Sequence, residues 1–490
     1  MKLNALEIKN FRGFESYKIS FSPRTSIIIG RNGAGKSTLI DALKIVLSFI
    51  FSNNKKLGKD FLSAGNPSLN VNSFSDSDYH YDSESGTTAP DAAVIGTAYY
   101  NGQQLKWELY KRSTANAALY STKYQEAFNL FMHEWKKNAA DLPLIACFSD
   151  SFPHKPTKQT QFAIDSIRKD RIPRNFGYYQ WDLETACTSI WETRLCNQLA
   201  HIAPLYTRAS RVASSLMELE ERYNAEQLVN NLDYQNAKAE QERIDSLFNP
   251  LHEEIEYVQN RLVIFSQKLP KLLEEQYYID YLAVATTGEN LELKIVFKNG
   301  ISKSLKDLPA GYCRLYSIVL DLAYRAYILN GDKESSGIVL IDEIDLHLHP
   351  SMEQDVVQCL REVFPQVQFI MTSHSAAVIV NLDTTEKVKD EETGSFIPAN
   401  QLVFMQEGQT EGEILPVIYG VDYNAALRDF MGSPSRNEDL RKKGDEFLNY
   451  CSMGLEEEAK TIIDELTTSL GTKHPFVKEL QEKAKVYEIH

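Results

Sequence analysis

Several features that mark whole classes of protein are missing from this sequence. No run approaches the roughly 18 consecutive apolar residues that a membrane-spanning helix needs, and the start MKLNALEIKNFRGFE lacks the apolar core of a secretory signal. The six cysteines are scattered, without a Cys-x-x-Cys pair or a Cys/His cluster at zinc spacing, which favours a reducing cytoplasm over a disulfide framework. Acidic residues outnumber basic ones by 67 to 52, so no global basic field attracts nucleic acid.

What remains is the composition of a globular protein, 490 residues long and 43% hydrophobic. An apolar run at 26–29 leads into GRNGAGKST and then into an apolar-periodic helix at 39–51. Residues 52–91 are rich in Ser, Asp, Asn and Gly and predict a loop. Two alternating runs between 93 and 111 meet at Asn101-Gly102, which predicts a β-hairpin.

The middle of the chain changes character. Residues 182–268 predict two antiparallel helices, interrupted near Asn249-Pro250, and strands return between 277 and 297. After Gly311, helices and strands alternate, which is typical of a parallel sheet. We therefore expect an α/β P-loop NTPase fold with an N-terminal lobe at 1–181, an inserted helical hairpin at 182–268, a C-terminal lobe at 269–405 and a helical C-terminal region at 406–490.

The strongest motif is G-x-x-x-x-G-K-[ST] between a strand and a helix. Its glycines let backbone N–H groups converge on an anion at the helix N-terminus. A lysine in this place reaches the β- and γ-phosphates, and the following hydroxyl binds Mg²⁺. The motif predicts a nucleotide site made of Gly30, Arg31, Asn32, Gly33, Ala34, Gly35, Lys36, Ser37 and Thr38.

Acidic residues end a later apolar strand. Asp342 follows Ile338–Ile341 directly, where a carboxylate can hold Mg²⁺ beside the phosphate loop, and Glu343 suits a general base that polarises the attacking water. His374, at the end of the next strand, is placed to sense the γ-phosphate. His347 and His349 form a His-x-His-Pro turn, for which capping and packing are favoured over metal binding because no third ligand is evident.

Together, NFRGF, GRNGAGKST, VLIDEIDLHLHP and TSHS resemble the ABC-type ATPases of the SMC, RecF and OLD group, across residues 1–380. The resemblance implies an ATPase head split by an inserted helical segment, and two heads that bind ATP and Mg²⁺ between them in a head-to-tail dimer. It makes Lys36 to Thr38 Walker A, Asp342-Glu343 Walker B, His374 the switch histidine and Asp345 the start of the D-loop.

One motif departs from that family. The signature Leu-Ser-x-Gly-Gln/Glu falls on residues 308–312, where Pro309 replaces the serine and Tyr312 the Gln/Glu. Proline offers neither hydroxyl nor N–H, so only the helix N-terminus and the backbone around Gly311 remain to meet a phosphate. We therefore expect ATP chiefly to hold subunits together, with slow turnover. No glutamine can be assigned to the Q-loop.

PtuA, the ATPase subunit of Septu anti-phage systems and of related retron systems, is similar to this chain over residues 312–315, 321–325, 414–436 and 456–485. That resemblance implies an HNH endonuclease partner, PtuB, and, in retron versions, a reverse transcriptase with its RNA–DNA hybrid. The chain itself carries no HNH-like constellation and no Asp-x-Asp after 407 for a TOPRIM nuclease, so we expect cutting to belong to the partner. The alternative is a RecF- or SMC-like repair ATPase that clamps DNA between two heads.

Two surface segments carry weaker hypotheses. Residues 154–174 hold six basic and two acidic side chains, which fits either phosphate contact or a solvated loop, and the adjoining aromatic residues 178–181 fit either base stacking or packing. The acidic helices after 438 fit either a docking face for a basic partner or an ordinary exposed surface. We favour docking, because the PtuA resemblance supplies a partner.

Overall fold

The computed structural model describes residues 1–53, 62–114, 117–138, 141–149, 160–169, 172–182, 188–224, 227–228, 230–269, 277–287, 290–390, 394–423, 425–426 and 437–485. The chain divides into two compact units, Met1–Gly420 and Val421–His490. In the lysine- and arginine-rich segment at 154–174, residues 154–159 and 170–171 lie outside the described residues, and they include Lys155, Lys158 and Arg171.

A six-stranded sheet forms the centre of the first unit, in the order β17-β16-β3-β13-β12-β8. Its neighbours pair in parallel except for β17, the short antiparallel edge strand. Every residue of β8, β12 and β13 is buried, as in a sheet covered on both faces. The strands are Leu144–Phe148 (β8), Gly337–Ile341 (β12), Val367–Thr372 (β13), Thr25–Gly30 (β3), Asn400–Met405 (β16) and Glu413–Ile414 (β17).

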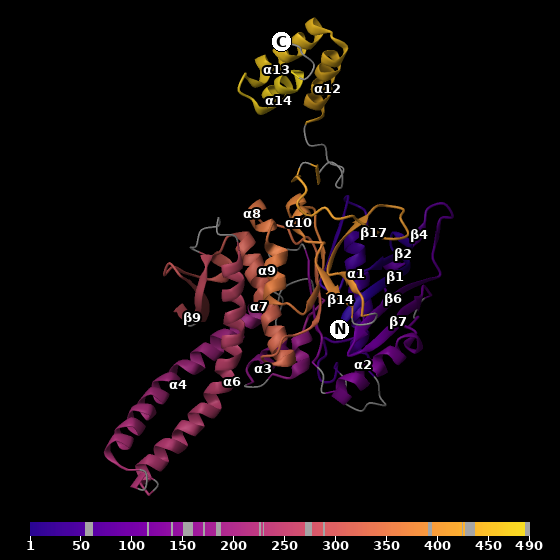
Figure 1. Cartoon of the computed structure of the whole chain (residues 1–490). Coiled ribbons are helices and arrows are strands. Elements are labelled where there is room, and N and C mark those ends of the chain that lie inside the picture. The colour runs from indigo at the N-terminus through magenta and orange to yellow at the C-terminus, as the bar shows by residue number, and fades with distance from the viewer. Residues whose placement is uncertain are drawn as a thin grey trace. The chain divides into compact units, whose positions relative to one another are not determined.

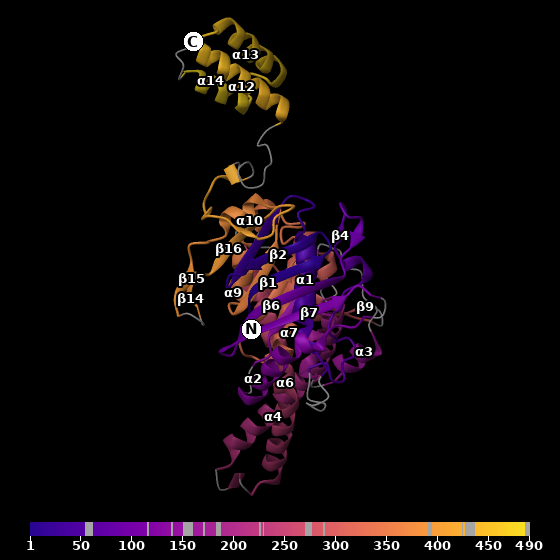
Figure 2. The same ribbon diagram turned by 90° about the vertical axis from the view of Figure 1, so that its right-hand side faces the viewer.

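A second, four-stranded antiparallel sheet is built from β2, β1, β6 and β7 (Phe14–Ser20, Lys2–Phe11, Asp91–Tyr100 and Gln103–Arg112). The expected hairpin between β6 and β7 is present, with Asn101 and Gly102 at positive φ in its turn. Helix α1 (Lys36–Leu47) contacts both β3 and β6, and Trp107 Nε1 donates to the Val46 carbonyl at 2.8 Å. Figure 2 shows α1 beside this sheet.

The region expected to be a loop at 52–91 has more structure than the sequence suggested. Its described part contains the one-turn helix η3 (Asp76–Asp78) and the short strands β4 (Tyr81–Asp82) and β5 (Thr87–Thr88). The structure also decides between base stacking and packing for the aromatic residues at 178–181. Tyr178, Tyr179 and Trp181 are buried, so packing explains them and base stacking does not.

Two long helices, α4 (Thr188–Arg222) and α6 (Leu232–Lys268), pack against each other and project from the sheets as a hairpin (Figures 1 and 2). Both run through a proline, Pro204 in α4 and Pro250 in α6, so the expected interruption at Asn249-Pro250 is wrong. A proline costs one backbone hydrogen bond, which packing between the helices offsets. Beyond the prolines, only Leu216 and Ile244 are buried among the described hairpin residues.

The base of the hairpin is held more firmly than its tip. Arg194 donates two hydrogen bonds to the Glu254 carboxylate at 2.5 and 2.6 Å, and both side chains are buried. The base also packs against a three-stranded sheet and against α7. That sheet contains Ser302–Lys303 (β11), Asn290–Phe297 (β10) and Ile279–Thr287 (β9), and α7 spans Ala310–Asn330.

The remaining elements of the first unit are shorter. They include the β-hairpin of Lys387–Lys389 (β14) with Phe396–Pro398 (β15), and the helices Gln125–Asn138 (α2), Gln161–Ile167 (α3), Pro350–Glu353 (α8), Val356–Val363 (α9) and Ala376–Asn381 (α10). Among the described helices, none combines the length and apolar character needed to cross a membrane.

The second unit contains α12 (Glu438–Met453), α13 (Glu456–Leu470) and α14 (Pro475–Ala484), packed around Phe447, Leu466, Phe476 and Leu480. The helical C-terminal region was expected to begin at 406, whereas residues 406–420 belong to the first unit. The reason is pairing: β17 adds to β16, and the Gly412 amide donates to the Lys18 carbonyl at 2.9 Å.

Candidate nucleotide-binding site

Three neighbouring strands of the central sheet bring the predicted site residues to one edge. β3 ends at the glycine-rich loop, β13 lies beside it and ends before His374, and β12 lies beside β13 and ends before Asp342. All three strands are parallel, so their carboxyl ends meet at the same edge, where open α/β sheets bind ligands. The structure therefore gathers these residues from positions more than 300 apart in the sequence.

The glycine-rich loop requires glycine for steric reasons. Gly33 and Gly35 have φ of +87° and +94°, which other residues rarely adopt. A Cβ at Gly35 would also lie 2.5 Å from the Phe14 ring, so the turn between β1 and β2 leaves no room for a side chain. Gly35 is the N-cap of α1, and the exposed residues Arg31–Gly33 leave the loop open at the helix N-terminus.

Lys36 is the buried cation of this loop. Its Nζ donates to the carbonyls of Gly30 at 2.9 Å and Arg31 at 3.1 Å. Burial lowers the pKa of the Lys36 ammonium, and the nearby carboxylates of Asp342 and Glu343 oppose that shift. The lysine thus lies between the loop and the acidic turn, where a phosphate would meet both the ammonium and the helix N-terminus.

A hydroxyl on β13 connects the two acidic residues. Thr372 Oγ1 donates to Oδ1 of the buried Asp342 and accepts from the Glu343 amide at 2.8 Å. The Asp342 amide also donates to the Phe148 carbonyl at 2.7 Å, which fixes the strand end from its other neighbour. Asp342 therefore has a defined orientation at the sheet edge, as a metal-binding carboxylate requires.

The turn after β12 is strained. Glu343 and His347 have φ of +50° and +63°, an uncommon conformation for residues other than glycine. Each such residue costs on the order of 1–3 kcal/mol and persists only where its surroundings fix it. Turn hydrogen bonds join the Leu346 amide to the Glu343 carbonyl at 3.0 Å and the Leu348 amide to the Asp345 carbonyl at 3.1 Å.

The switch region after β13 contacts the same turn. The His374 amide donates to Asp345 Oδ1 at 3.2 Å, and the histidine is partly exposed at the sheet edge. His349 caps α8 by accepting from the Ser351 amide at 3.3 Å, as expected from the sequence. Among the described residues, no three His, Cys, Asp or Glu side chains group closely enough to hold a metal by themselves.

Gly311 lies in the first turn of α7, whose N-cap is Pro309. A Cβ on Gly311 would come within 2.9 Å of the His347 carbonyl, so glycine allows α7 to pack closely on the turn after β12. This contact is a packing reason for the glycine. The further expectation that its amide meets a phosphate stays a prediction.

This geometry suits a nucleoside triphosphate with a divalent metal. The loop amides and Lys36 could hold phosphates, and Ser37 with the oriented Asp342 could hold Mg²⁺ through oxygen ligands. The exposed Ser37 and the buried Asp342 both lie at this edge, so the donor set fits the ion.

Two residues with structural roles at the site were not assigned from the sequence. Thr372 was noted only as part of the motif after β13, and Arg314 only as part of a family match. Arg314 is buried on α7 and donates to three carbonyls of the acidic turn. The signal for Arg314 was an arginine within an apolar helix, one turn after Gly311.

Comparison with known proteins identifies the fold family. A family model described as AAA ATPase domain matches residues 1–379, more than three quarters of the chain. The chain belongs to this AAA ATPase domain family. An ATPase domain of this kind binds nucleotide, and the matched range contains every residue of the candidate site.

Several curated proteins are similar. The Retron Ec83 probable ATPase of Escherichia coli is 24% identical over 78% of this chain and 70% of its own length. The Retron Vc95 probable ATPase of Vibrio cholerae is 27% identical over 79% and 73%. The Septu protein PtuA of Bacillus mycoides is 27% identical, over 45% of this chain and 33% of its own length.

One similar solved structure is the Smc head domain of Pyrococcus furiosus bound to the C-terminal domain of ScpA. The alignment covers 84% of this chain and 96% of the Smc chain, with 15% sequence identity and a TM-score of 0.41. The fold assignment therefore depends on the family match, which agrees with the resemblance seen in the sequence.

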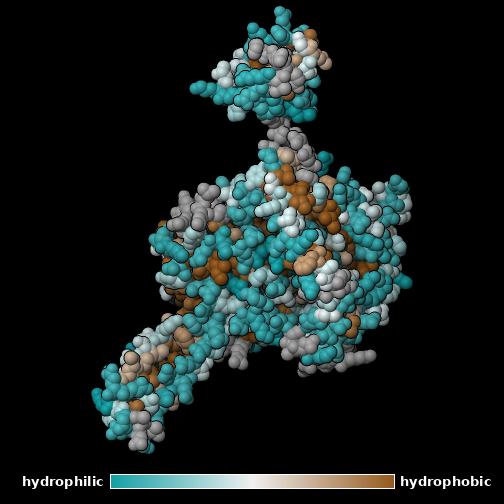
Figure 3. All heavy atoms as spheres, in the orientation of Figure 1, coloured by the Kyte–Doolittle hydropathy of each residue, from teal (hydrophilic) through white to brown (hydrophobic). Residues whose placement is uncertain are grey.

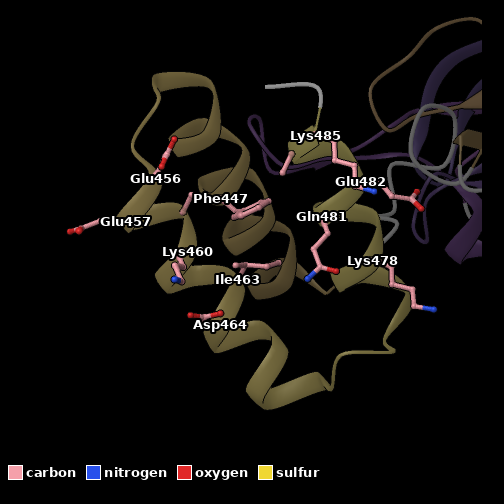
Figure 4. A pocket seen from close by; sticks show the side chains of 12 residues that line it. Phe447, Glu456, Glu457, Lys460, Ile463, Asp464, Lys478, Gln481, Glu482 and Lys485 are labelled. Atoms are coloured by element: carbon pink, nitrogen blue, oxygen red, sulfur yellow. The ribbon is translucent and has the colours of Figure 1, made fainter. Parts of the chain in front are cut away.

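A hollow lies in the C-terminal unit, between α13 and α14, with a volume of about 830 Å³. Figure 4 shows the charged side chains Glu456, Glu457, Lys460 and Asp464 along α13, Lys478 and Glu482 along α14 with Lys485 at its end, and Phe447 between the helices. The hollow thus has an apolar floor and charged rims.

The outer surface of the first unit is mostly hydrophilic in the view of Figure 3, with a hydrophobic strip where Figure 1 draws α10 and β17. Exposed apolar side chains on the segment after β16 include Ile414, Val417 and Tyr419. Exposed apolar groups that gather in this way are typical of surfaces that contact other molecules.

Proposed function

We propose that this chain is the ATP-binding regulatory subunit of an anti-phage defence complex. ATP and Mg²⁺ bind at the edge of the central sheet and hold two or more subunits head to tail. The assembly controls an HNH endonuclease and, in a retron, operates with a reverse transcriptase and its RNA–DNA hybrid. The observation that carries the proposal is the convergence of Lys36, Asp342 and Glu343 at one sheet edge.

Each site residue has a role in this proposal. Loop residues 30–38 bind the phosphates, and Ser37 and Asp342 bind the metal. Glu343 polarises the attacking water, as a general base must, while His374 senses the γ-phosphate. The backbone around Gly311 meets the nucleotide of a second subunit.

Similarity to retron ATPases supports the defence role over a repair role. The two retron proteins align over 78% and 79% of this chain, whereas the matches to RecF of Lactococcus lactis span only 60 to 71 residues. A short match of that kind includes little beyond the motifs that many such ATPases share. We therefore keep the repair ATPase only as an outcome of the test.

The first test is native mass spectrometry of the tagged chain, co-expressed with its flanking genes and purified with and without nuclease treatment. We expect an HNH-sized protein in a large complex, with the ATPase in excess. A mass lost only after nuclease treatment would indicate a bound nucleic acid. A lone dimer without a partner protein would contradict the defence proposal and favour the repair ATPase.

Nucleotide dependence is tested with two variants. Lys36→Ala removes the buried ammonium and should abolish both ATP binding and assembly. Glu343→Gln keeps the side-chain shape and should preserve both while stopping residual turnover. Assembly lost in Lys36→Ala with turnover intact would contradict the proposal that ATP chiefly holds subunits together.

We further propose that the hollow of the C-terminal unit is the docking site for the nuclease. Both rims carry mixed charges: acidic residues outnumber Lys460 on α13, and on the other rim Lys478 and Lys485 outnumber Glu482. This pattern suits an amphipathic helix whose apolar face enters the hollow. Reversing Lys478 to glutamate should release the partner, while the matched reversal of Lys442, exposed on α12, should not.

A further inference from the structure

We infer that Arg314 is a positioning residue for the acidic turn of the ATP site, and this inference rests on the proposed function. Arg314 lies on α7, outside the glycine-rich loop. Its guanidinium contacts the backbone of the turn, so it acts through other residues. The turn in question spans Asp342 to Leu348, and it carries both the metal-binding carboxylate and the proposed base.

The guanidinium donates hydrogen bonds to the carbonyls of every second residue in the first part of the turn. Nη2 donates to the Asp342 carbonyl at 3.0 Å, and Nη1 donates to the carbonyls of Ile344 at 3.0 Å and Leu346 at 3.2 Å. The side chain is only 1% exposed, so water does not compete for these bonds. A planar fork with several fixed donors suits this arrangement, whereas a lysine ammonium is a single point of charge.

These bonds coincide with the strained part of the turn. Glu343 and His347, both at positive φ, lie between and directly after the three bonded carbonyls. Such conformations persist only where the surroundings determine the backbone. Arg314 holds the backbone of the turn through its carbonyls, and Thr372 holds it through the Glu343 amide, from which its hydroxyl accepts a hydrogen bond.

Helix α7 therefore sets the direction of the Glu343 side chain. Gly311, one turn before Arg314, brings the helix close to the His347 carbonyl, so α7 contacts the acidic turn at a second point. Lys36, in contrast, donates its hydrogen bonds to two carbonyls at the end of β3 and the start of the loop after it. Loss of Arg314 should misplace the base while leaving nucleotide binding nearly intact, because Thr372 still holds the Asp342 carboxylate.

The same helix offers a matched control. Arg325 is also 1% exposed, and its Nη1 donates to the carbonyls of Gly177 and Tyr179, both at 2.9 Å. Replacing either arginine by lysine removes a buried guanidinium from α7. Only Arg314→Lys removes hydrogen bonds to the acidic turn.

The experiment compares Arg314→Lys, Arg314→Met and Arg325→Lys in the full chain by amide hydrogen exchange, binding of a fluorescent ATP analogue, and turnover. For both Arg314 variants we expect at least tenfold faster exchange in peptides covering 342–348, nucleotide affinity within about threefold of wild type, and kcat reduced at least tenfold with KM unchanged. Arg325→Lys should keep wild-type exchange in that turn and wild-type kcat, even if its melting temperature falls as far as that of the Arg314 variants.

Unchanged exchange in the acidic turn of both Arg314 variants would overturn the inference. So would equal effects of Arg314→Lys and Arg325→Lys on turn exchange, because Arg314 would then act only through global stability. A wild-type chain that binds no nucleotide would overturn the proposed function instead, and turn exchange would still decide whether Arg314 holds the backbone.

Discussion

Replacing Thr372 by valine removes one hydroxyl from the centre of the candidate site and little else. The two side chains have nearly the same shape, so β13 should keep its packing. The hydroxyl donates to the Asp342 carboxylate and accepts from the Glu343 amide. The substitution therefore frees both acidic residues at once, without touching the glycine-rich loop.

The magnitude follows from these two bonds. A hydrogen bond to a charged group contributes roughly 1.5–3 kcal/mol, and a neutral one about 1 kcal/mol. Removing the partner that orients a metal-binding carboxylate typically weakens metal binding by about 10- to 100-fold. We therefore expect Thr372→Val to weaken ATP binding in Mg²⁺ by that factor and to leave binding in EDTA nearly unchanged.

Isothermal titration calorimetry with ATP, in Mg²⁺ and in EDTA, measures both quantities. Thr372→Ser is the matched control, because serine keeps the hydroxyl and loses only the methyl group, and it should bind within about threefold of wild type. The reasoning fails if the valine and serine variants bind alike in Mg²⁺. It also fails if valine weakens binding equally in EDTA, because Asp342 would then not hold the metal.

Three further substitutions test other parts of the structure. Gly35→Ala places a Cβ 2.5 Å from an aromatic ring and should weaken nucleotide binding at least tenfold by calorimetry. Arg194→Met leaves the buried Glu254 carboxylate unpaired and should lower the free energy of unfolding, measured in urea, by about 3–5 kcal/mol. The double variant Arg194→Met with Glu254→Leu should regain most of that stability. Hydrogen bonds from Ser75 and Arg12 outweigh burial and lower the pKa of Asp78 below 3.8. The stability lost in Asp78→Asn should therefore be constant above about pH 4 and shrink as the pH falls further, in thermal melts over that range.

Much of the fold and part of the site could be predicted because short-range rules determine them. The loop at 30–38 needs glycine, a strand before it and a helix after it, and all three are visible within 25 residues of sequence. The turn at Asn101-Gly102 is likewise local, since positive φ at two successive residues selects those residue types. The long helices followed from apolar periodicity alone.

The predictions that failed depended on contacts between distant segments. Pro250 was expected to interrupt a helix because a proline lacks an N–H, yet α6 continues through it while packed against α4. The boundary at 406 was wrong because the strand that begins at Glu413 pairs with β16 and has almost no length of its own. Neither outcome is encoded in the local residue types, because the partner that stabilises it lies elsewhere in the chain.

The same limit explains why the acidic turn was only half understood from its sequence. Asp342 and Glu343 are recognisable because carboxylates after an apolar strand have few other uses near a phosphate loop. What fixes their orientation is a hydroxyl 30 residues downstream and a guanidinium 28 residues upstream. Threonine and arginine occur in sequences for many reasons, so neither residue type by itself predicts that it orients the acidic turn. Only the sheet order, with β13 between β3 and β12, places the end of β13 between the loop and the turn.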